Sequence, residues 1–415
     1  MLNLKNNNLV LVLIIFLYII SLYIGFYLGE DLSTGGSNWD FNQTWPVVVD
    51  FSNNVFNTIT QYTRHVPLHY FVLSLIYKIL DSQFYVRIFF SIFVLLLPLF
   101  LFLNLKKIYN YPKINLLLVS FCVILLPYFR SSSIWPNTHL TALIFLTIGN
   151  YFYLEASQKN KKIYCFLNLL FTAFATYSIQ TYVLFFIFYL YHYFKNLSKK
   201  DFASLFIFCV ILSLPGWYLL SFNDRVARIT ISTDFFYTIA TNFSIIGFFL
   251  VMFLFNKDNL LKFKEYLLKL NKFEILLITI LFLSVIFKFN YHDMHGGGGF
   301  FYKISKFLFN NNILFYLSFL MGLVLSIICI KIDKNFLFLI ILINGLNLNY
   351  AVYQKYFEPV FLVMILIFYK NFLVNNLLRY KKNVIFFNII IILYFTLGQI
   401  NGYFKLSKEI LPFLN

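Results

Sequence analysis

Residues 9–28 read LVLVLIIFLYIISLYIGFYL, a nearly unbroken apolar run. A helix of about 20 residues, rising 1.5 Å per residue, crosses the hydrocarbon core of a bilayer. The run is long for the apolar region of a signal peptide, and no small-residue cleavage site follows it. We therefore expect a membrane-spanning helix that is retained in the mature chain.

Similar runs recur along the 415 residues, of which 60% are hydrophobic and only 12% charged. A soluble domain carries about 25% charged residues, so this chain lacks the polar surface that water requires. We expect an all-α fold, a polytopic membrane helix bundle of about 13 transmembrane helices that forms a single integral membrane domain over 1–415. The expected spans are 9–28, 85–103, 114–129, 138–154, 163–178, 181–194, 202–222, 235–255, 273–289, 313–330, 336–348, 360–378 and 384–402.

The formal charge of +17 reflects Lys and Arg residues that gather in short loops, as they do on the cytoplasmic side of membrane proteins. No nucleic-acid partner is needed to explain it. If the N-terminus is cytoplasmic and the segment 67–80 does not cross the membrane, most of the basic residues lie on the cytoplasmic side. This orientation predicts a bacterial inner-membrane protein with two large outer loops, 29–84 and the glycine-rich 290–312, and chemistry on the extracytoplasmic face. The Lys-rich stretch 257–274, in contrast, predicts an amphipathic helix at the cytoplasmic lipid surface.

The four cysteines each lie inside an apolar run and show no CxxC spacing. This pattern favours buried small hydrophobic residues over a disulfide framework or a metal site. We expect no cofactor and assign no metal ligands, and a divalent metal is not excluded.

The first outer loop carries the densest acidic group of the chain: Glu30, Asp31, Asp40 and Asp50. Apolar residues at helical spacing follow Asp40, which predicts an amphipathic helix at the membrane interface. A carboxylate at this position can act as a general base that takes a proton from an acceptor hydroxyl. The alternative is that Asp40 caps the helix that follows it.

A second helix is predicted from Pro67 onwards, because proline is favoured in the first helical turn. His65 and His69 flank this proline and are four residues apart, a spacing that can hold a metal on one helix face. No third ligand follows at a recognisable spacing, so polar packing is the favoured interpretation.

The order of these features resembles the GT-C class of membrane glycosyltransferases. An outer-facing span is followed by a loop with an acidic residue and then by a histidine-proline-leucine-aromatic segment. Next come Val86-Arg87-Ile88-Phe89, which resembles the class's small-x-Arg motif, the pair Lys106-Lys107, and a third span ending in Leu126-Pro127. Protein O-mannosyltransferases and lipid A aminoarabinose transferases share this layout, and the resemblance covers about 1–155. Two departures are that Phe41, not a second acidic residue, follows Asp40, and that 130–139 contains no acidic residue.

The resemblance implies a transferase that takes a sugar from a polyprenyl-phosphate donor, with Asp40 in the position of the catalytic acidic residue. The acceptor would be a glycan, a lipid or a protein. The cations that would hold the donor phosphate are Arg64, Arg130 and Lys355. The residues that would border the substrate pocket are His65, His69, Gln180, Tyr353, Tyr356 and Glu358.

Each of these residues also has a structural interpretation. Arg130 can be an interfacial anchor, Gln180 can cap a helix junction, and tyrosines are common at this depth of a membrane. The alternative function is an O-antigen polymerase or ligase, which would depend on later outer-loop residues such as Arg225. A transporter ranks lowest, because neither repeated halves nor clear ionisable residues within the spans are visible.

Overall fold

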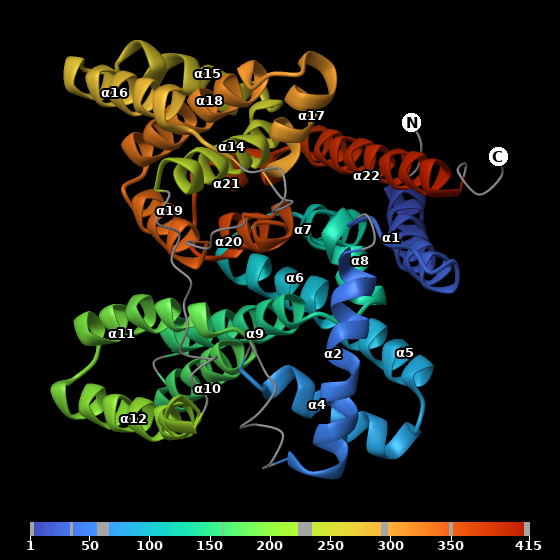
Figure 1. Ribbon diagram of the computed structural model, residues 1–415. Coiled ribbons are helices and arrows are strands. Elements are labelled where there is room, and N and C mark those ends of the chain that lie inside the picture. Colours follow the sequence, from blue (N-terminus) through green and yellow to red (C-terminus); the bar gives the residue numbers. More distant parts are fainter. Residues whose placement is uncertain are drawn as a thin grey trace. The chain divides into compact units, whose positions relative to one another are not determined.

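The computed structural model describes residues 4–33, 36–55, 66–159, 161–222, 235–291, 298–347 and 352–410. Every regular element in these ranges is helical (Figure 1). The chain divides into two compact units, Met1–Arg228 with Ile391–Asn415, and Ile229–Ile390. The two units are described separately below.

The first unit contains an N-terminal helix, a group of shorter helices and a set of longer packed helices. They are α1 (Leu4–Tyr27), α2 (Gly36–Asn53), α4 (Leu68–Leu80), α5 (Gln83–Phe93), α6 (Leu96–Ile108), α7 (Lys113–Phe121), η1 (Cys122–Leu125), α8 (Pro127–Ile134), α9 (Thr138–Lys159), α10 (Lys162–Ser178), η2 (Gln180–Val183), α11 (Leu184–Asn196) and α12 (Lys199–Phe222).

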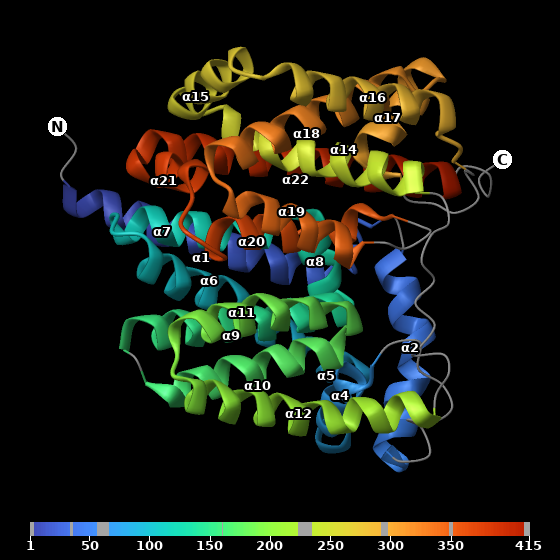
Figure 2. The same cartoon turned by 90° about the vertical axis from the view of Figure 1, so that its left-hand side faces the viewer.

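The second unit is built around the packed pair α14 and α18. Its elements are α14 (Phe235–Leu254), α15 (Lys257–Leu268), α16 (Lys272–Lys288), α17 (Gly299–Phe309), α18 (Ile313–Ile332), α19 (Asn335–Leu346), η4 (Gln354–Tyr356), α20 (Val360–Ile367) and α21 (Phe372–Arg379). The last helix, α22 (Lys381–Ile410), begins in this unit and ends in the first. It is drawn in red in Figure 2.

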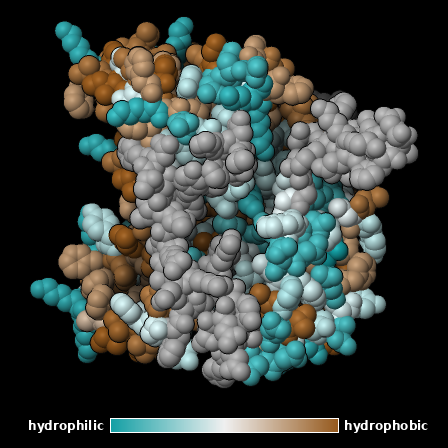
Figure 3. Space-filling view, viewed as in Figure 1, coloured by the Kyte–Doolittle hydropathy of each residue, from teal (hydrophilic) through white to brown (hydrophobic). Residues whose placement is uncertain are grey.

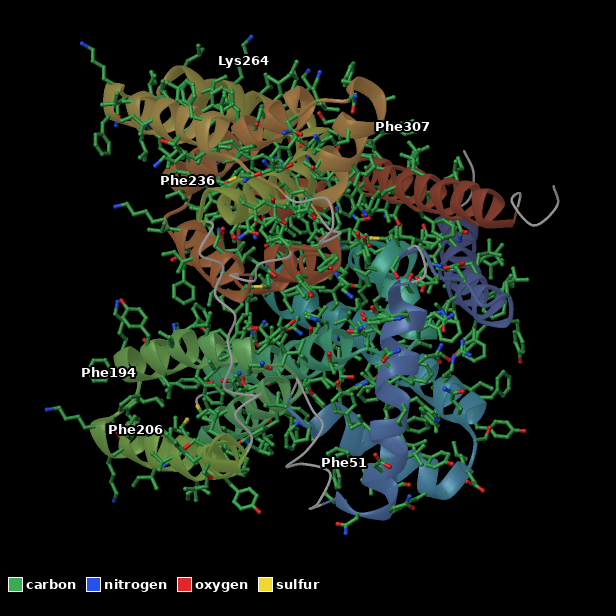
Figure 4. The ribbon with its side chains drawn as sticks, in the orientation of Figure 1. Phe51, Phe194, Phe206, Phe236, Lys264 and Phe307 are labelled. Carbon is green, nitrogen blue, oxygen red and sulfur yellow. The ribbon has the colours of Figure 1, made fainter. Side chains whose placement is uncertain are left out.

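Five helices of the described residues are long and apolar enough to cross a membrane, and eight segments qualify if each bent pair counts as one span. Their outer surfaces are apolar where no helix covers them, and hydrophobic side chains are visible on the outside in Figure 3. Phe194 on α11 and Phe206 on α12 point outward (Figure 4) and are more than half exposed. Several long apolar helices with apolar outer surfaces indicate an integral membrane protein.

The prediction of about 13 spans is not confirmed. The expected span 114–129 is divided among α7, η1 and α8, which bend by 65° where Leu126 is extended and Pro127 starts a new helix. Other apolar runs, such as Leu68–Leu80 and Asn335–Leu346, form helices of only 10–17 residues. The two expected outer loops also contain helices: α2 and α4 in the first, and α17 in the glycine-rich one.

Asparagine and tyrosine side chains join four helices inside the first unit. Asn150 on α9 donates to Asn104 on α6 over 3.0 Å, and Tyr189 on α11 donates to Asn150 over 3.1 Å. On α10, Asn168 accepts from Tyr193 and donates to the carbonyl of Gly149. In a bilayer such polar groups have no water to bind, so these hydrogen bonds hold the helices together.

Charged side chains lie together at the C-terminal end of α9, where the Glu155 carboxylate is 2.6 Å from Lys107 of α6 and 2.9 Å from Lys159. Burial alone would raise the pKa of the Glu155 carboxyl, but hydrogen bonds from Lys107, Lys159 and Tyr151 lower it to about 2. Lys107 and Lys159 lie at the C-terminal ends of α6 and α9, and both contact Glu155. The charge pattern predicts the loops that follow these two helices on the same side of the membrane.

In the second unit, α14 and α18 approach each other closely at two glycines. A Cβ atom added to Gly322 would collide with the backbone oxygen of Phe243, and one added to Gly247 would lie 2.7 Å from the Cα of Gly322. Ser244 and Ser318 share a hydrogen bond of 2.6 Å beside this crossing. Small residues four apart, as Ser318 and Gly322 are, allow helix backbones to touch in membranes.

We expect Gly322→Ala to destabilise the second unit by at least about 1–3 kcal/mol, the usual cost of overpacking, because the new methyl group collides with backbone that cannot move aside. The measurement is the shift of the thermal unfolding midpoint of the full chain in detergent. The matched control is Gly216→Ala on α12, where the nearest atom to the new Cβ is a tyrosine hydroxyl at 3.4 Å. Equal midpoints for the two variants would contradict the close crossing.

Candidate functional site

The first outer segment is fixed where α2 begins. The Asp31 carboxylate accepts hydrogen bonds from the backbone N–H groups of Ser33 and Asn38, at 2.9 and 2.8 Å. Because α2 starts at Gly36, Asp40 lies in its second turn and is not its N-cap. The interpretation of Asp40 as a helix cap is therefore wrong, and Asp31 is the carboxylate that binds a backbone N–H group of the first turn, that of Asn38.

Arg130 on α8 is buried in an ion pair with Glu30. Its Nε and Nη2 donate to the two oxygens of the Glu30 carboxylate at 2.5 and 2.8 Å. Its Nη1 and Nη2 also donate to the hydroxyl and the backbone oxygen of Ser21 on α1, at 2.9 and 2.7 Å. The exposed fraction of the side chain is 1% for Arg130 and 10% for Glu30. These four bonds occupy all three nitrogens of the guanidinium, so the donor-phosphate role predicted for Arg130 has no support in this geometry.

Three neighbours complete the surroundings of this ion pair. Gln399 on α22 donates to the second oxygen of Glu30 over 2.8 Å, and Trp135 donates to the Glu30 backbone oxygen over 3.1 Å. A Cβ atom on Gly25 would lie 2.6 Å from both the Arg130 Nη2 and a Glu30 carboxylate oxygen. A side chain at this point of α1 would displace the ends of the Arg130 and Glu30 side chains, so glycine leaves the room in which the two charged groups meet.

Arg87 on α5 lies beside this cluster and is only partly buried. Its guanidinium carbon stacks 3.7 Å from the centre of the Trp135 ring, and its Nε donates to the Ile134 carbonyl over 2.9 Å. Its two terminal nitrogens make no hydrogen bond to the part of the chain that the structure describes. Arg87 thus has a fixed position and two N–H₂ groups available for a ligand oxygen, the geometry suited to a phosphate or carboxylate.

Asp40 lies on α2, next to a residue that packs against Trp135. Phe41 is buried, and its ring lies 6.1 Å from that of Trp135, the ring on which Arg87 stacks. Asp40 itself is partly exposed. Burial, and secondarily the charge of Asp40, raise the pKa of the Tyr70 phenol on α4. The carboxylate therefore lies within electrostatic reach of Tyr70, and the phenol remains a hydrogen-bond donor at neutral pH.

An apolar cavity of about 460 Å³ opens between α2, α4, α10 and α12. Phe51, which extends sideways from α2 in Figure 4, forms part of its wall. On the opposite wall, the Tyr177 hydroxyl donates to the Leu212 carbonyl over 2.6 Å and accepts from the Gly216 N–H over 2.9 Å. The hydroxyl thus lies between a carbonyl and an N–H group that are four residues apart in α12. This part of α12 contains Pro215, which lacks a backbone N–H and interrupts the hydrogen bonds of the helix. The lining residues are Phe51, Val55, Pro67, Leu68, Phe71, Ala173, Phe174, Tyr177, Ile211, Leu212, Pro215, Tyr218 and Leu219.

Two of the predicted pocket residues of the first unit are held inside the protein. His69 on α4 is buried, and its Nδ1 lies 2.8 Å from the hydroxyl oxygen of Thr141 on α9. Gln180 lies in η2, and its amide oxygen is buried with no hydrogen-bond partner among the described residues. The hydroxyl of the nearby Tyr182 is in the same state. His69 fits the polar-packing interpretation, whereas the Gln180 amide oxygen and the Tyr182 hydroxyl are buried without a hydrogen bond among the described residues.

The remaining described candidates belong to the second unit. Lys355 lies over the rings of Tyr353 and Tyr356, with its Nζ 5.5 and 5.9 Å from their centres. Glu358 is fully buried, and its N–H donates to the backbone oxygen of Gln354 over 3.0 Å. The side chain of Gln354 accepts from the Phe300 N–H at the start of α17. This segment is thus a folded part of the second unit.

Asp40, Tyr70, Arg87 and the Glu30–Arg130 pair all belong to the first unit, where Asp40 lies within electrostatic reach of Tyr70 and Arg87 stacks on Trp135. Arg64 and His65 lie outside the described residues. Glu30 was not predicted as the partner of Arg130, and Arg87 was named only as part of a motif. An arginine within an apolar stretch was the available signal for Arg87, since such a charge requires a partner or a function. No cluster of three or more potential metal ligands occurs among the described residues.

We expect Glu30→Gln to lower the free energy of unfolding by about 3–5 kcal/mol, because Arg130 would keep a buried charge without its counter-ion. The measurement is unfolding of the full chain by titration with sodium dodecyl sulfate. The matched control is Glu265→Gln, which removes an exposed pair with Lys269 and should leave the free energy of unfolding nearly unchanged. The double variant Glu30→Gln/Arg130→Met should recover part of the loss, and a double variant as unstable as the sum of both single variants would refute the pairing.

No protein-family model, curated protein or solved structure matches this chain. Its function therefore has to be inferred from the residues of the site themselves.

Proposed function

We propose that this chain is a membrane glycosyltransferase that moves a sugar from a polyprenyl-phosphate donor to an acceptor hydroxyl on the extracytoplasmic face, with inversion at the anomeric carbon. The observation that carries the proposal is that Trp135 joins two parts of the site. The partly exposed cation Arg87 stacks on its ring, and Phe41, the neighbour of the partly exposed carboxylate Asp40 on α2, packs 6.1 Å from the same ring. The order of motifs over 1–155, which resembles the GT-C class, supports the same reaction.

In this reaction Asp40 removes the proton of the acceptor hydroxyl as its oxygen attacks the anomeric carbon. The bond between that carbon and the phosphate oxygen breaks, and the polyprenyl phosphate leaves with the bonding electrons. A phosphate is a good leaving group and needs no acid to protonate it. What it needs is a cation that stabilises the charge developing on its oxygens.

Arg87 takes over the phosphate-binding role that the sequence analysis gave to Arg130. The guanidinium of Arg130 is hydrogen-bonded to Glu30 and Ser21. The terminal nitrogens of Arg87, in contrast, form no hydrogen bond within the described part of the chain. Stacking on Trp135 holds the plane of the Arg87 guanidinium in place, so binding a phosphate requires little further ordering.

The apolar cavity supports a lipid substrate in the same unit. Two of its walls are formed by α2, which carries Asp40, and by α4, which carries Tyr70. Its lining is almost entirely aliphatic and aromatic, the surface that a hydrocarbon chain requires. A donor whose chain lies among these helices would have its phosphate at the end of the same helices.

We expect Asp40→Asn to lower the rate of sugar transfer by at least about 100-fold, because general-base catalysis typically contributes that much. The assay is release of polyprenyl phosphate from a panel of short-chain polyprenyl-phosphate hexoses by the purified full chain. The matched control is Asp50→Asn, which removes an exposed carboxylate from the same helix and should leave the rate unchanged. Transfer that survives loss of Asp40 would end the proposal.

We expect Arg87→Met to weaken donor binding about 10- to 100-fold, the loss that one or two hydrogen bonds to a charged group imply. Arg87→Lys should restore part of it, because it keeps the charge but lacks the planar pair of donors. The measurements are the KM for the donor and the KM for the acceptor. A purely structural role of Arg87 would lower the unfolding midpoint in both variants and leave the KM of the remaining folded enzyme unchanged.

A further inference from the structure

The helix α15 runs almost at right angles to α16, with a bend of 98° between them. Most of the surface of α16 is exposed and apolar, including Phe273, Leu276, Ile280 and Phe287. A helix with such a surface lies across the hydrocarbon core, since it would otherwise present these side chains to water. If α16 crosses the membrane, α15 lies in the plane of the membrane surface.

The turn between the two helices is held by specific contacts. Asn271 and Glu274 form a reciprocal capping box at the start of α16. Lys331, from the last turn of α18, donates to the Lys269 backbone oxygen and to the Glu274 carboxylate, both over 2.7 Å. The angle of α15 is therefore determined by the fold of the second unit.

One face of α15 is anchored to the protein. Asn259 is buried and donates to the backbone oxygens of Phe253 and Leu373, and Asn376 on α21 donates to its side-chain oxygen over 2.8 Å. Phe263, one turn later, is buried and lies against the ring of Phe372. These contacts leave the opposite face uncovered by any other helix in the part of the chain that the structure describes.

That opposite face combines leucines with lysines. Leu260, Leu261, Leu267 and Leu268 are 54%, 56%, 48% and 79% exposed. Their positions follow helical spacing, and Lys264 lies between them and points away from the helix in Figure 4. Four exposed leucines on a short helix would be unfavourable in water, whereas at a bilayer surface they enter the acyl region while lysine stems extend to the phosphates.

The charges of this segment indicate which headgroups the face meets. Glu265 pairs with Lys269, and Glu274 pairs with Lys331. Lys257, Lys264 and Lys272 form no ion pair with the described residues. The exposed face of α15 and its turn is therefore cationic, and its complement is an anionic surface.

We propose that α15 is a membrane-surface helix that binds anionic lipid headgroups through Lys257, Lys264 and Lys272 while Leu260, Leu261, Leu267 and Leu268 enter the lipid. This proposal concerns the second unit alone and does not depend on the proposed sugar transfer.

The test places a fluorophore on the full chain through Leu268→Cys, with Cys209→Ala removing the one half-exposed cysteine among the four. The protein is reconstituted in vesicles of phosphatidylcholine, with and without phosphatidylglycerol. Quenching by lipid-attached nitroxide reports insertion, and quenching by iodide reports exposure to water. A label at Leu276→Cys on α16 is the internal control, and it should be quenched by nitroxide in every vesicle.

We expect the label at position 268 to be quenched mainly by nitroxide when phosphatidylglycerol is present and more by iodide without it. The triple variant Lys257→Gln/Lys264→Gln/Lys272→Gln should lose the preference for phosphatidylglycerol, since each lysine near an anionic surface contributes about fivefold. The matched control Lys161→Gln/Lys199→Gln/Lys200→Gln removes three exposed lysines of the first unit and should keep the preference.

Three results would overturn the proposal. Iodide quenching in both kinds of vesicle would place α15 in water. Nitroxide quenching that depends neither on phosphatidylglycerol nor on the three lysines would reduce the contact to apolar insertion. Shielding from iodide without nitroxide quenching would show that another protein covers this face.

Discussion

Moving a guanidinium out of water costs several kcal/mol unless a carboxylate and further acceptors replace the lost hydration. In the first unit this requirement falls on Arg130, whose acceptors come from α1 and from Glu30, the residue next to Asp31. Gln399 of α22 binds the same carboxylate. Four parts of the chain must therefore be in place before this charge is compensated. Because Asp31 in turn binds the start of α2, the position of Asp40 depends on the same ion pair.

The helical membrane architecture could be predicted from composition, because a backbone without water must satisfy its own hydrogen bonds. The local prediction at Pro67 was also correct, since α4 starts at the next residue. The number of spans was not predictable in the same way. An apolar run such as Asn335–Leu346 has the composition of a span but forms a helix of 12 residues inside the second unit. Hydropathy reports that a segment is buried, and it does not distinguish lipid from protein as the surroundings.

The candidate site was harder to predict, because its contacts join residues far apart in sequence. Glu30 and Arg130 are separated by 100 residues, and no local pattern links a glutamate in one loop to an arginine in another. Asp40 was named from its place in the loop, but whether it caps α2 depended on where that helix starts. Arg87 stood inside an apolar run, and only the position of the Trp135 ring shows that its guanidinium is held in place with its terminal nitrogens open. Chemistry-bearing residue types were recognisable in the sequence, whereas their pairing was not.

The 17 residues of α16 give it a length of about 25 Å, shorter than the roughly 30 Å of an average hydrocarbon core. A helix of this length can be accommodated if the bilayer thins around it or if its flanking residues are drawn inward. Because α15 is fixed almost at a right angle to the N-terminal end of α16, this end of α16 cannot move deeper into the bilayer unless the lysine-bearing α15 also enters the acyl chains. If α16 crosses the bilayer as proposed, the second unit is matched to a thin membrane, and bilayer thickness becomes a variable that biases where this protein accumulates.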